Sequence, residues 1–322
     1  MSAKVQLFTV SADEEGQRLD NYLATRLKGV PKSAVYRVIR KGEVRVNKGR
    51  AKPDLRLQIG DVVRVPPLRL AETQPVAAPG QSLVQHLQQS ILYDEGGLLI
   101  VNKPAGLAVH GGSGISLGLI EALRQMPGHH GFLELIHRLD RETSGCVMIA
   151  RKRSALKYFQ EGLREREGVQ KSYLALVQGA WPKGVMTVDV PLKRFLQNNG
   201  ERIVRVNNEG KQSLTRFEVL ESFPQATLVR ASPVTGRTHQ IRVHALHKGC
   251  PLVGDDKYGD TPLNESFREM GSRRLFLHAE KLDLTLPDGK SLSVTAPLPN
   301  DLGDLLLKLR QASGHLFVTK KL

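Results

Sequence analysis

The 322-residue sequence predicts an α+β protein in which a small basic domain precedes a larger domain built on a mixed, mostly antiparallel sheet. Three observations predict this arrangement. Positive charge is concentrated near the N-terminus, the next stretch has the composition of a linker, and the strand-like segments after it do not alternate regularly with helices. We therefore expect a small domain over residues 1–70, a linker over 71–90 that can end in a short helix, a large domain over 91–312 and a loose tail over 313–322.

The charge of the chain points to a polyanionic partner. The chain carries 47 Lys and Arg residues against 32 Asp and Glu residues, a net charge of +15. Residues 1–70 hold 15 of these cations and 7 of the anions, so more than half of the excess lies in less than a quarter of the chain. Such a cluster favours nucleic acid or an anionic membrane surface, with a merely basic soluble protein as the alternative.

The composition excludes several classes of protein. With 40% hydrophobic and 25% charged residues, the chain has the composition of a globular protein and not of a disordered one. It has no run of about 20 apolar residues, so we expect no helix that spans a membrane, and its start has no secretion signal. We expect no membrane partner, and the low number of cysteines fits the reducing cytoplasm best. Cys146 and Cys250 are too few for a disulfide framework, and neither has a partner at metal-site spacing.

The pattern between residues 17 and 67 predicts two helices followed by short strands. The first helix carries apolar residues at helical spacing, at Leu19, Tyr22, Leu23 and Leu27. The second begins at Ser33 as its N-cap and ends before Gly42, which suits a left-handed C-terminal cap. Strand-like composition then marks 43–47, and 55–65 is typical of two strands around a turn.

The large domain is predicted to be rich in strands. Two segments, 154–165 and 301–311, have the apolar spacing of helices. The strand-like segments are 98–102, 146–150, 172–179, 214–221, 226–232, 274–279 and 292–297. Because they do not alternate with helices, a doubly wound parallel sheet is disfavoured.

A dense basic face is expected in the small domain. Residues 32–52 hold eight Lys and Arg residues and one Glu, on one stripe of a helix and on the hairpin that follows. Cations fixed on one face neutralise phosphates without reading a sequence, whereas a single charged stripe is usually a solvated helix surface. The second basic element favours nucleic-acid binding.

One segment of the large domain combines a carboxylate with two cations. HRLDRETSG (137–145) places Asp140 between Arg138 and Arg141. A carboxylate flanked by arginines is biased towards its ionised form, as a nucleophile or a base requires. From the residues alone, an Asp in a polar loop with ordinary ion pairs is the preferred interpretation, and a catalytic carboxylate is the alternative.

PVTGRTHQIRVH (233–244) is predicted to form a strand in its second half, from residue 238 onward. Residues two apart share a face of a strand, so Arg242 would meet Asp140 while Ile241 and Val243 enter the core. A metal site at the histidines is disfavoured, because basic neighbours repel a cation and no acidic ligand is compelling. Structural or RNA-facing roles are preferred for His239, His244 and His247.

Residues 17–66 resemble the αL RNA-binding module found in the fourth protein of the small ribosomal subunit and in many RNA-modifying enzymes. The matching runs are RLDNYLATRL, PKSAVYRVIRKGEVRVNKGR and GDVVRV. The resemblance implies that the RNA-facing residues are Lys32, Ser33, Arg37, Arg40, Lys41 and Asn47.

Four motifs, in order, resemble the RluA-type pseudouridine synthase family across residues 90–300. They are NKPAGLAVH (102–110), HRLDRETSG (137–145), KSYLALVQG (171–179) and PVTGRTHQIRVH (233–244). The resemblance implies the pseudouridine synthase fold and the isomerisation of uridine to pseudouridine in RNA, with no cofactor and no metal. The basic N-terminal run and GERIVRVNNEGK (200–211) resemble members of this family that act on the large ribosomal subunit, and this resemblance implies 23S ribosomal RNA or a pre-ribosomal particle as the substrate.

Substrate and assembly state stay open at this point. The same chemistry on transfer RNA, or at another ribosomal site, would use the same catalytic motifs. A non-catalytic RNA-binding protein of ribosome assembly would keep the same fold. Nothing in the sequence demands more than a monomer.

The family resemblance also implies roles for individual residues. Asp140 matches the essential aspartate, which acts as a nucleophile or as a base at the sugar, and Arg242 matches an arginine that pairs with it. Tyr173 matches a tyrosine that lies against the target base, and Arg138 matches an arginine that enters the RNA stack where that base has flipped out. Two further residues are expected around the substrate, Lys171 and His137.

Overall fold

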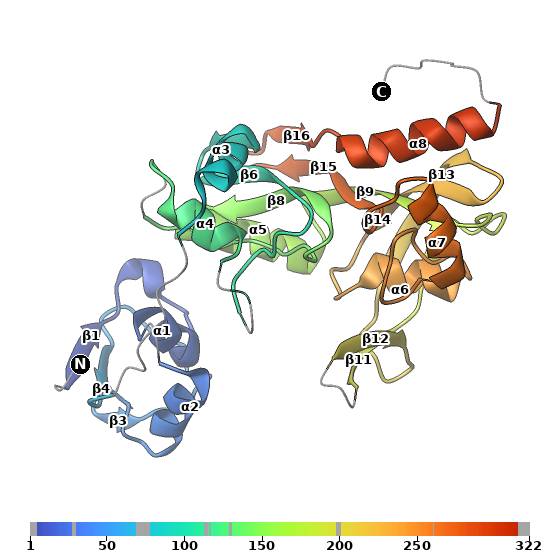
Figure 1. Ribbon diagram of the computed structural model, residues 1–322. Helices are drawn as coiled ribbons and strands as arrows, with labels where there is room; N and C mark the ends of the chain where they lie inside the picture. Colours follow the sequence, from blue (N-terminus) through green and yellow to red (C-terminus); the bar gives the residue numbers. More distant parts are fainter. Residues whose placement is uncertain are drawn as a thin grey trace. The chain divides into compact units, whose positions relative to one another are not determined.

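The computed structural model describes residues 5–27, 30–68, 78–112, 115, 117–128, 131–197, 201–259 and 261–314 (Figure 1). The chain divides into two compact units, residues 1–77 (unit 1) and residues 78–322 (unit 2). The expected linker lies outside the described residues up to residue 77, and its end forms helix α3 (Gln81–Gln89). Leu87 of α3 is fully buried in the largest core cluster of unit 2, so this helix is part of that unit. Most of the expected tail also lies outside the described residues.

Unit 1 packs two helices against a small sheet. Its elements are β1 (Gln6–Thr9), a 3-10 helix η1 (Ala12–Glu14), α1 (Leu19–Arg26), α2 (Lys32–Arg40), β2 (Arg45–Val46), β3 (Gly49–Arg50) and β4 (Val62–Val65). The strands pair antiparallel in the order β1-β4-β2-β3. The two predicted helices are confirmed, and their apolar stripes form one buried cluster with the strands. Gly42 follows α2 with a left-handed φ of 71°, as its position predicts.

Two details of unit 1 differ from the sequence-based prediction. Pro31 caps the start of α2, and Ser33 lies inside its first turn. The strand expected over 55–58 does not form, because its backbone groups bond to the segment that leads into α1. The Leu57 N–H, for example, donates to the Gln17 carbonyl oxygen at 2.9 Å.

Unit 2 is built on one ten-stranded sheet, drawn from teal to red in Figure 1. Besides α3, its elements are β5 (Ile91–Glu95), β6 (Leu98–Lys103), α4 (Leu119–Gln125), β7 (Glu134–Leu135), β8 (Ser144–Ala150), α5 (Arg153–Glu165), β9 (Val169–Gln178), β10 (Thr187–Asp189), β11 (Leu192–Leu196), β12 (Arg202–Val206), β13 (Leu214–Ser222), β14 (Ala226–Pro233), α6 (Gln240–His247), α7 (Thr261–Glu269), β15 (Leu277–Thr285), β16 (Ser291–Thr295) and α8 (Asn300–Ala312). Within the described residues, no helix is long and apolar enough to cross a membrane.

The topology of the large sheet confirms the predicted fold class. The strand order is β10-β13-β14-β9-β15-β8-β6-β5, with β16 added to β15 and β7 added to β8. The pairs are antiparallel except for β8 with β15, which run parallel. Strands β11 and β12 form a separate hairpin, which extends from the body of the unit below α6 in Figure 1. This hairpin and helices α4 and α7 were not predicted from the sequence.

The last two residues of the HRLDRETSG motif, Ser144 and Gly145, begin strand β8, which pairs with β15 in parallel. Gly145 lies opposite Ala279 in this pair, and a Cβ at position 145 would lie 2.2 Å from the Ala279 carbonyl oxygen. Gly145 also has a φ of 109°, a region that glycine adopts without steric cost. A glycine is therefore required where the loop that carries Asp140 enters the sheet.

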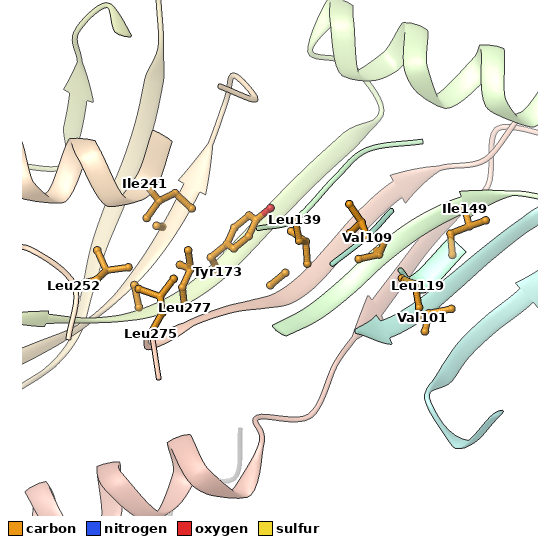
Figure 2. Packing of buried hydrophobic residues seen from close by; sticks show 14 of the residues in the cluster. Val101, Val109, Leu119, Leu139, Ile149, Tyr173, Ile241, Leu252, Leu275 and Leu277 are labelled. Atoms are coloured by element: carbon orange, nitrogen blue, oxygen red, sulfur yellow. The ribbon is translucent and has the colours of Figure 1, made fainter. Parts of the chain in front are cut away.

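The largest buried cluster of unit 2 anchors three parts of the predicted site. Figure 2 shows Leu139, Tyr173 and Ile241 in this cluster, with side chains from several strands around them. Leu139 directly precedes Asp140, and Ile241 directly precedes Arg242. Because protein interiors are close-packed, these neighbours restrict the backbone positions of both charged residues.

The strand predicted over 238–244 is wrong, because residues 240–247 form helix α6. Ile241 and Val243 are buried as expected, but Gln240 and His244 are buried as well. The Gln240 amide bonds to β13 and to the loop that precedes the helix, which satisfies its polar atoms. Because Gln240 and His244 are polar but buried, the apolar residues of this segment do not recur at helical spacing. Ile241 and Val243 alternate with polar residues instead, a pattern that is typical of a strand.

Two buried histidines of unit 2, and a third that is half-buried, predict that the protein loses stability in acid. Burial lowers the pKa of His244 and of His278 to about 4, and that of His137 to about 3, from an ordinary value of 6.5. Between pH 6.5 and about pH 4 the unfolded chain therefore binds more protons than the folded chain. The free energy of unfolding is expected to fall as the pH is lowered through this window, by up to ~1.4 kcal/mol per pH unit for each histidine. Urea unfolding at pH 7 and pH 5 measures this change.

A control for this prediction lies on the same helix. His247 is exposed on α6, whereas His244 is buried. His244→Asn is expected to reduce the pH dependence of the unfolding free energy, and His247→Asn to leave it unchanged. Equal free energies of unfolding at the two pH values in the parent protein would contradict the prediction.

Candidate active site

Asp140 lies in a loop that leads from β7 into β8. The loop turns at this residue, whose carbonyl oxygen accepts a hydrogen bond from the Thr143 N–H at 3.2 Å. The Asp140 side chain is 22% exposed and lines a cavity of about 890 Å³. This volume lies within the range of ~300–1,000 Å³ that is common for ligand pockets. A substrate can therefore reach a carboxylate that is partly shielded from water.

The NKPAGLAVH segment holds the loop of Asp140 in place. The buried ammonium group of Lys103 donates three hydrogen bonds of 2.7–3.0 Å to the carbonyl oxygens of Pro104, Leu107 and Arg141. Arg141 and Gly106 exchange two further hydrogen bonds of 2.9 Å, one through backbone groups and one through the Arg141 guanidinium. Arg141 therefore ties two loops together, and it makes no ion pair with Asp140 among the described residues.

Two side chains from the start of α6 contact the same oxygen of Asp140. Arg242 Nη1 donates to Oδ2 at 3.2 Å, and His239 Nε2 lies 3.7 Å from the same atom. The other oxygen, Oδ1, has no hydrogen-bond partner in the part of the chain that the structure describes. The carboxylate is thus held on one side and free on the other, which suits a nucleophile or a base.

Asp255 holds Arg242, and the sequence analysis did not identify it. Its carboxylate is completely buried and accepts from Arg242 Nε and Nη2, each at 2.7 Å. It also accepts from the N–H groups of Lys257 and Tyr258 at 3.0 Å. Burial alone would lower the pKa of Arg242, but the hydrogen bonds and charge of Asp255, together with Asp140, outweigh burial and raise it. Arg242 therefore stays cationic, with its planar fork fixed by one carboxylate and presented to the other.

Strand β9 brings Tyr173 and Lys171 to the same cavity. Burial and, to a smaller extent, the charge of Asp140 raise the pKa of the Tyr173 phenol, so it is protonated at neutral pH. Burial lowers the pKa of Lys171 to about 8. The Lys171 ammonium group has no hydrogen-bond or ion-pair partner among the described residues, so it is available to an anionic group of a ligand.

His137 and Arg138 lie side by side in the chain but differ in their surroundings. His137 Nε2 accepts a hydrogen bond from the Met148 N–H at 3.1 Å, which joins the loop to β8. Arg138 is exposed and has no side-chain partner in the described ranges. The structure places all the site residues predicted for the large domain at one cavity: His137, Arg138, Asp140, Lys171, Tyr173 and Arg242.

Unit 1 presents the cations of α2 at a second cavity, of about 500 Å³. It is lined by Ser33, Tyr36, Arg37, Arg40 and Lys41. Arg37, Arg40 and Lys41 are exposed, and the two arginines make no ion pair within the described residues. An exposed cluster of unpaired guanidinium groups suits phosphate binding.

The structure gives less support for RNA contact by the other two predicted RNA-facing residues, Asn47 and Lys32. The side-chain amide of Asn47 donates to Asp61 Oδ1 at 2.7 Å and accepts from the Val62 N–H at 2.9 Å. Asn47 therefore stabilises its own turn, and its contact with RNA stays a prediction. The side chain of Lys32 lies outside the described part of the structure.

Comparisons with known proteins match both units. A family model described as RNA pseudouridylate synthase matches residues 97–247, and an S4 domain model matches residues 17–63. Ribosomal large subunit pseudouridine synthase C of Yersinia pestis is 53% identical over 309 residues, which cover 95% of this chain and 96% of the relative. The protein of the same name from Escherichia coli (strain K12) is 53% identical over 312 residues, which cover 96% and 98%.

A solved structure is also similar to this chain. Human RNA Pseudouridylate Synthase Domain Containing 4 has a TM-score of 0.59 and 29% sequence identity. The alignment covers 71% of this chain and 96% of the human chain. The matches therefore fall on the two segments in which the sequence predicted an RNA-binding module and a catalytic domain.

Proposed function

The chain belongs to the RNA pseudouridylate synthase family. We propose that it isomerises uridines of large-subunit (23S) ribosomal RNA to pseudouridine, and that its substrate is either the free RNA or the RNA in a pre-ribosomal particle. The names of the relatives support the ribosomal substrate, since they match at 53% identity over nearly the whole chain. The observation that carries the proposal is the carboxylate of Asp140. Its Oδ2 is held by Arg242, and its Oδ1 is free in the cavity that also holds Tyr173 and Arg138.

Asp140 is proposed to act at the sugar of the target nucleotide. Its free Oδ1 either attacks the sugar or removes a proton from it, so that the bond between N1 of uracil and C1′ breaks. The uracil then turns and its C5 bonds to C1′, while the bond between Asp140 and the sugar breaks or, in the other route, Asp140 returns the proton to the sugar. The proton lost from C5 is balanced by a proton gained at N1. Arg242 keeps a cation beside the carboxylate and fixes its orientation.

Tyr173 and Arg138 are proposed to bind the extruded nucleotide. The ring of Tyr173 is proposed to supply a plane against which the uracil packs, and its hydroxyl is proposed to take part in the proton transfer at C5. The free guanidinium of Arg138 enters the RNA stack where the base has left. Extrusion costs a few kcal/mol, and phosphate contacts of both units offset it.

Unit 1 is proposed to bind phosphates through α2. A variant with Gln at the three exposed cations is expected to bind RNA more weakly and to lower the slope of log Kd against log salt by roughly 2–3, because each phosphate contact releases about one counterion. The replaced residues are Arg37, Arg40 and Lys41. Fluorescence anisotropy with a labelled 23S rRNA fragment over a series of salt concentrations measures the slope.

The matched control removes the same charge from unit 2. In this control variant, Gln replaces Lys281, Lys290 and Lys308. Each of these three lysines contacts a partner within unit 2. Gln at these positions is expected to change the slope less. If the α2 variant keeps the slope of the parent protein, unit 1 does not bind phosphates through these residues.

Mapping of pseudouridines in total RNA tests the proposed substrate. A strain that lacks the gene is expected to lose pseudouridines from 23S ribosomal RNA, and purified protein to restore them in vitro. Loss of sites in transfer RNA alone would exclude the ribosomal substrate. A parent protein without activity on any RNA would favour a non-catalytic RNA-binding role.

A further inference from the structure

His239 lies between Asp140 and Tyr258 at the start of α6. Its Nδ1 is 2.7 Å from the Tyr258 hydroxyl, and its Nε2 is 3.7 Å from Asp140 Oδ2. The backbone of His239 has a φ of 53°, in the left-handed region that residues with a Cβ rarely adopt. Strained backbone of this kind persists where the surrounding structure holds a side chain in a required place.

The partners of Tyr258 decide which nitrogen of His239 carries the hydrogen. The phenol oxygen of Tyr258 accepts from the Val204 N–H on β12 at 3.0 Å. For the phenol hydrogen, the described residues offer one acceptor within hydrogen-bonding distance, His239 Nδ1. Tyr258 is buried, and a buried hydroxyl without an acceptor is costly. Nδ1 therefore accepts, and the neutral ring carries its hydrogen on Nε2, which faces Asp140.

His239 is neutral at physiological pH. Burial lowers its pKa to about 4; the cations of Arg242 and Lys257 act in the same direction, and the carboxylates of Asp140 and Asp255 oppose it. A neutral N–H group orients a carboxylate by a hydrogen bond. It does so without offering a labile proton that would neutralise the carboxylate.

We propose that His239 is a positioning residue for Asp140 and that Tyr258 selects the tautomer in which His239 donates from Nε2. The proposal rests on the proposed function of Asp140 as the reacting carboxylate. Arg242 donates to Oδ2, and the N–H on His239 Nε2 faces the same oxygen, so a hydrogen bond from His239 fixes the plane of the carboxylate and presents Oδ1 to the substrate. The distance of 3.7 Å is longer than a hydrogen bond, and such contacts tighten when substrate fills a site.

Two substitutions of His239 separate this role from a structural one. His239→Gln keeps an N–H donor at the position of Nε2, but Gln fits the left-handed backbone poorly. His239→Asn fits that backbone better and keeps an acceptor for Tyr258, but its side chain is too short to reach Asp140. Single-turnover rates, RNA affinity and thermal midpoints are measured for both variants.

Of the two variants, the one whose residue fits the left-handed backbone better, His239→Asn, is expected to be the slower enzyme. His239→Asn is expected to lower the single-turnover rate by roughly 10–100-fold with unchanged RNA affinity, which corresponds to the loss of one hydrogen bond to a charged group. His239→Gln is expected to be at least about fivefold faster than His239→Asn, although it is the less stable variant. Equal rates, or a faster Asn variant, would overturn the proposal.

Nitrogen NMR of the parent protein tests the tautomer directly. Protein labelled with 15N-histidine is expected to show His239 as the neutral Nε2–H form at pH 7, with the resonance assigned by its loss in His239→Gln. Tyr258→Phe is expected to abolish this preference, and Tyr158→Phe, which removes a hydroxyl from α5, to leave it unchanged. A parent ring protonated on Nδ1, or a Tyr258→Phe ring that keeps the parent tautomer, would overturn the proposal.

The outcome of these tests is separable from that of the proposed function. Pseudouridine formation by the parent protein and its loss in Asp140→Asn establish the function. If both are observed and the His239 results go the other way, the positioning role alone is rejected. If the parent protein makes no pseudouridine, the proposed function fails, and the NMR result still decides whether Tyr258 sets the tautomer.

Discussion

Replacement of Asp140 by Asn is expected to slow pseudouridine formation by at least about 10³-fold while RNA binding and folding change little. Asn has nearly the same size and keeps an oxygen near the site, but its amide is neither a nucleophile nor a base at neutral pH. Arg242 keeps its two hydrogen bonds to Asp255 in this variant, so no buried cation is left without a partner. Release of tritium from RNA that contains [5-³H]uridine measures the reaction, and anisotropy measures binding.

The same substitution at an exposed position provides the control for Asp140. Asp256 lies in the same unit, with a side chain that is 80% exposed and paired with Arg268 on the surface. Asp256→Asn is expected to retain the rate of the parent protein, because an exposed ion pair contributes little. An Asp140→Asn protein with the activity of the parent would show that another group starts the reaction.

Periodicity predicted most elements of the fold because their apolar residues recur regularly. Helices α1, α2, α5 and α8 and the long strands of the large sheet were predicted from these patterns and are present. The pattern fails where polar residues are buried. In α6 the side chains of Gln240 and His244 lie inside, with partners that only the folded chain supplies, and the segment therefore looked like a strand.

The ion pairs of the site could be predicted only in part. The resemblance to a family indicated Asp140 and Arg242, which are 102 residues apart and meet at 3.2 Å. Local charge suggested that Arg138 and Arg141 would accompany Asp140, yet neither pairs with it among the described residues, and Arg141 donates to the Gly106 carbonyl oxygen instead. In the sequence, Asp255 is one of two acidic residues that follow the apolar run CPLV. No local pattern indicates which distant cation pairs with such a residue in the folded protein.

Asp255 is expected to be the most sensitive position for stability. Asp255→Asn places an amide N–H group against the guanidinium donors of Arg242, and Arg242 is left with a single carboxylate, Asp140, beside it. Removal of one partner from a buried ion pair destabilises proteins by about 3–5 kcal/mol, and we expect a loss of this size in the free energy of unfolding. Urea unfolding measures it, and Asp301→Asn, which breaks a pair with Arg274 at a carboxylate that is 41% exposed, is expected to cost much less.

The two carboxylates that share Arg242 are also expected to be coupled. In Asp255→Asn, Asp140 is the one remaining anion with a hydrogen bond to Arg242 among the described residues, so its removal then costs more than it does in the parent protein. The double variant is therefore expected to lose more stability than the two single losses added together, by about 0.5–3 kcal/mol. Additive losses in a double-mutant cycle would mean that Asp140 and Asp255 act on Arg242 independently. A coupled result would mean that the carboxylate proposed to react also shares in the stability of the buried cation that orients it.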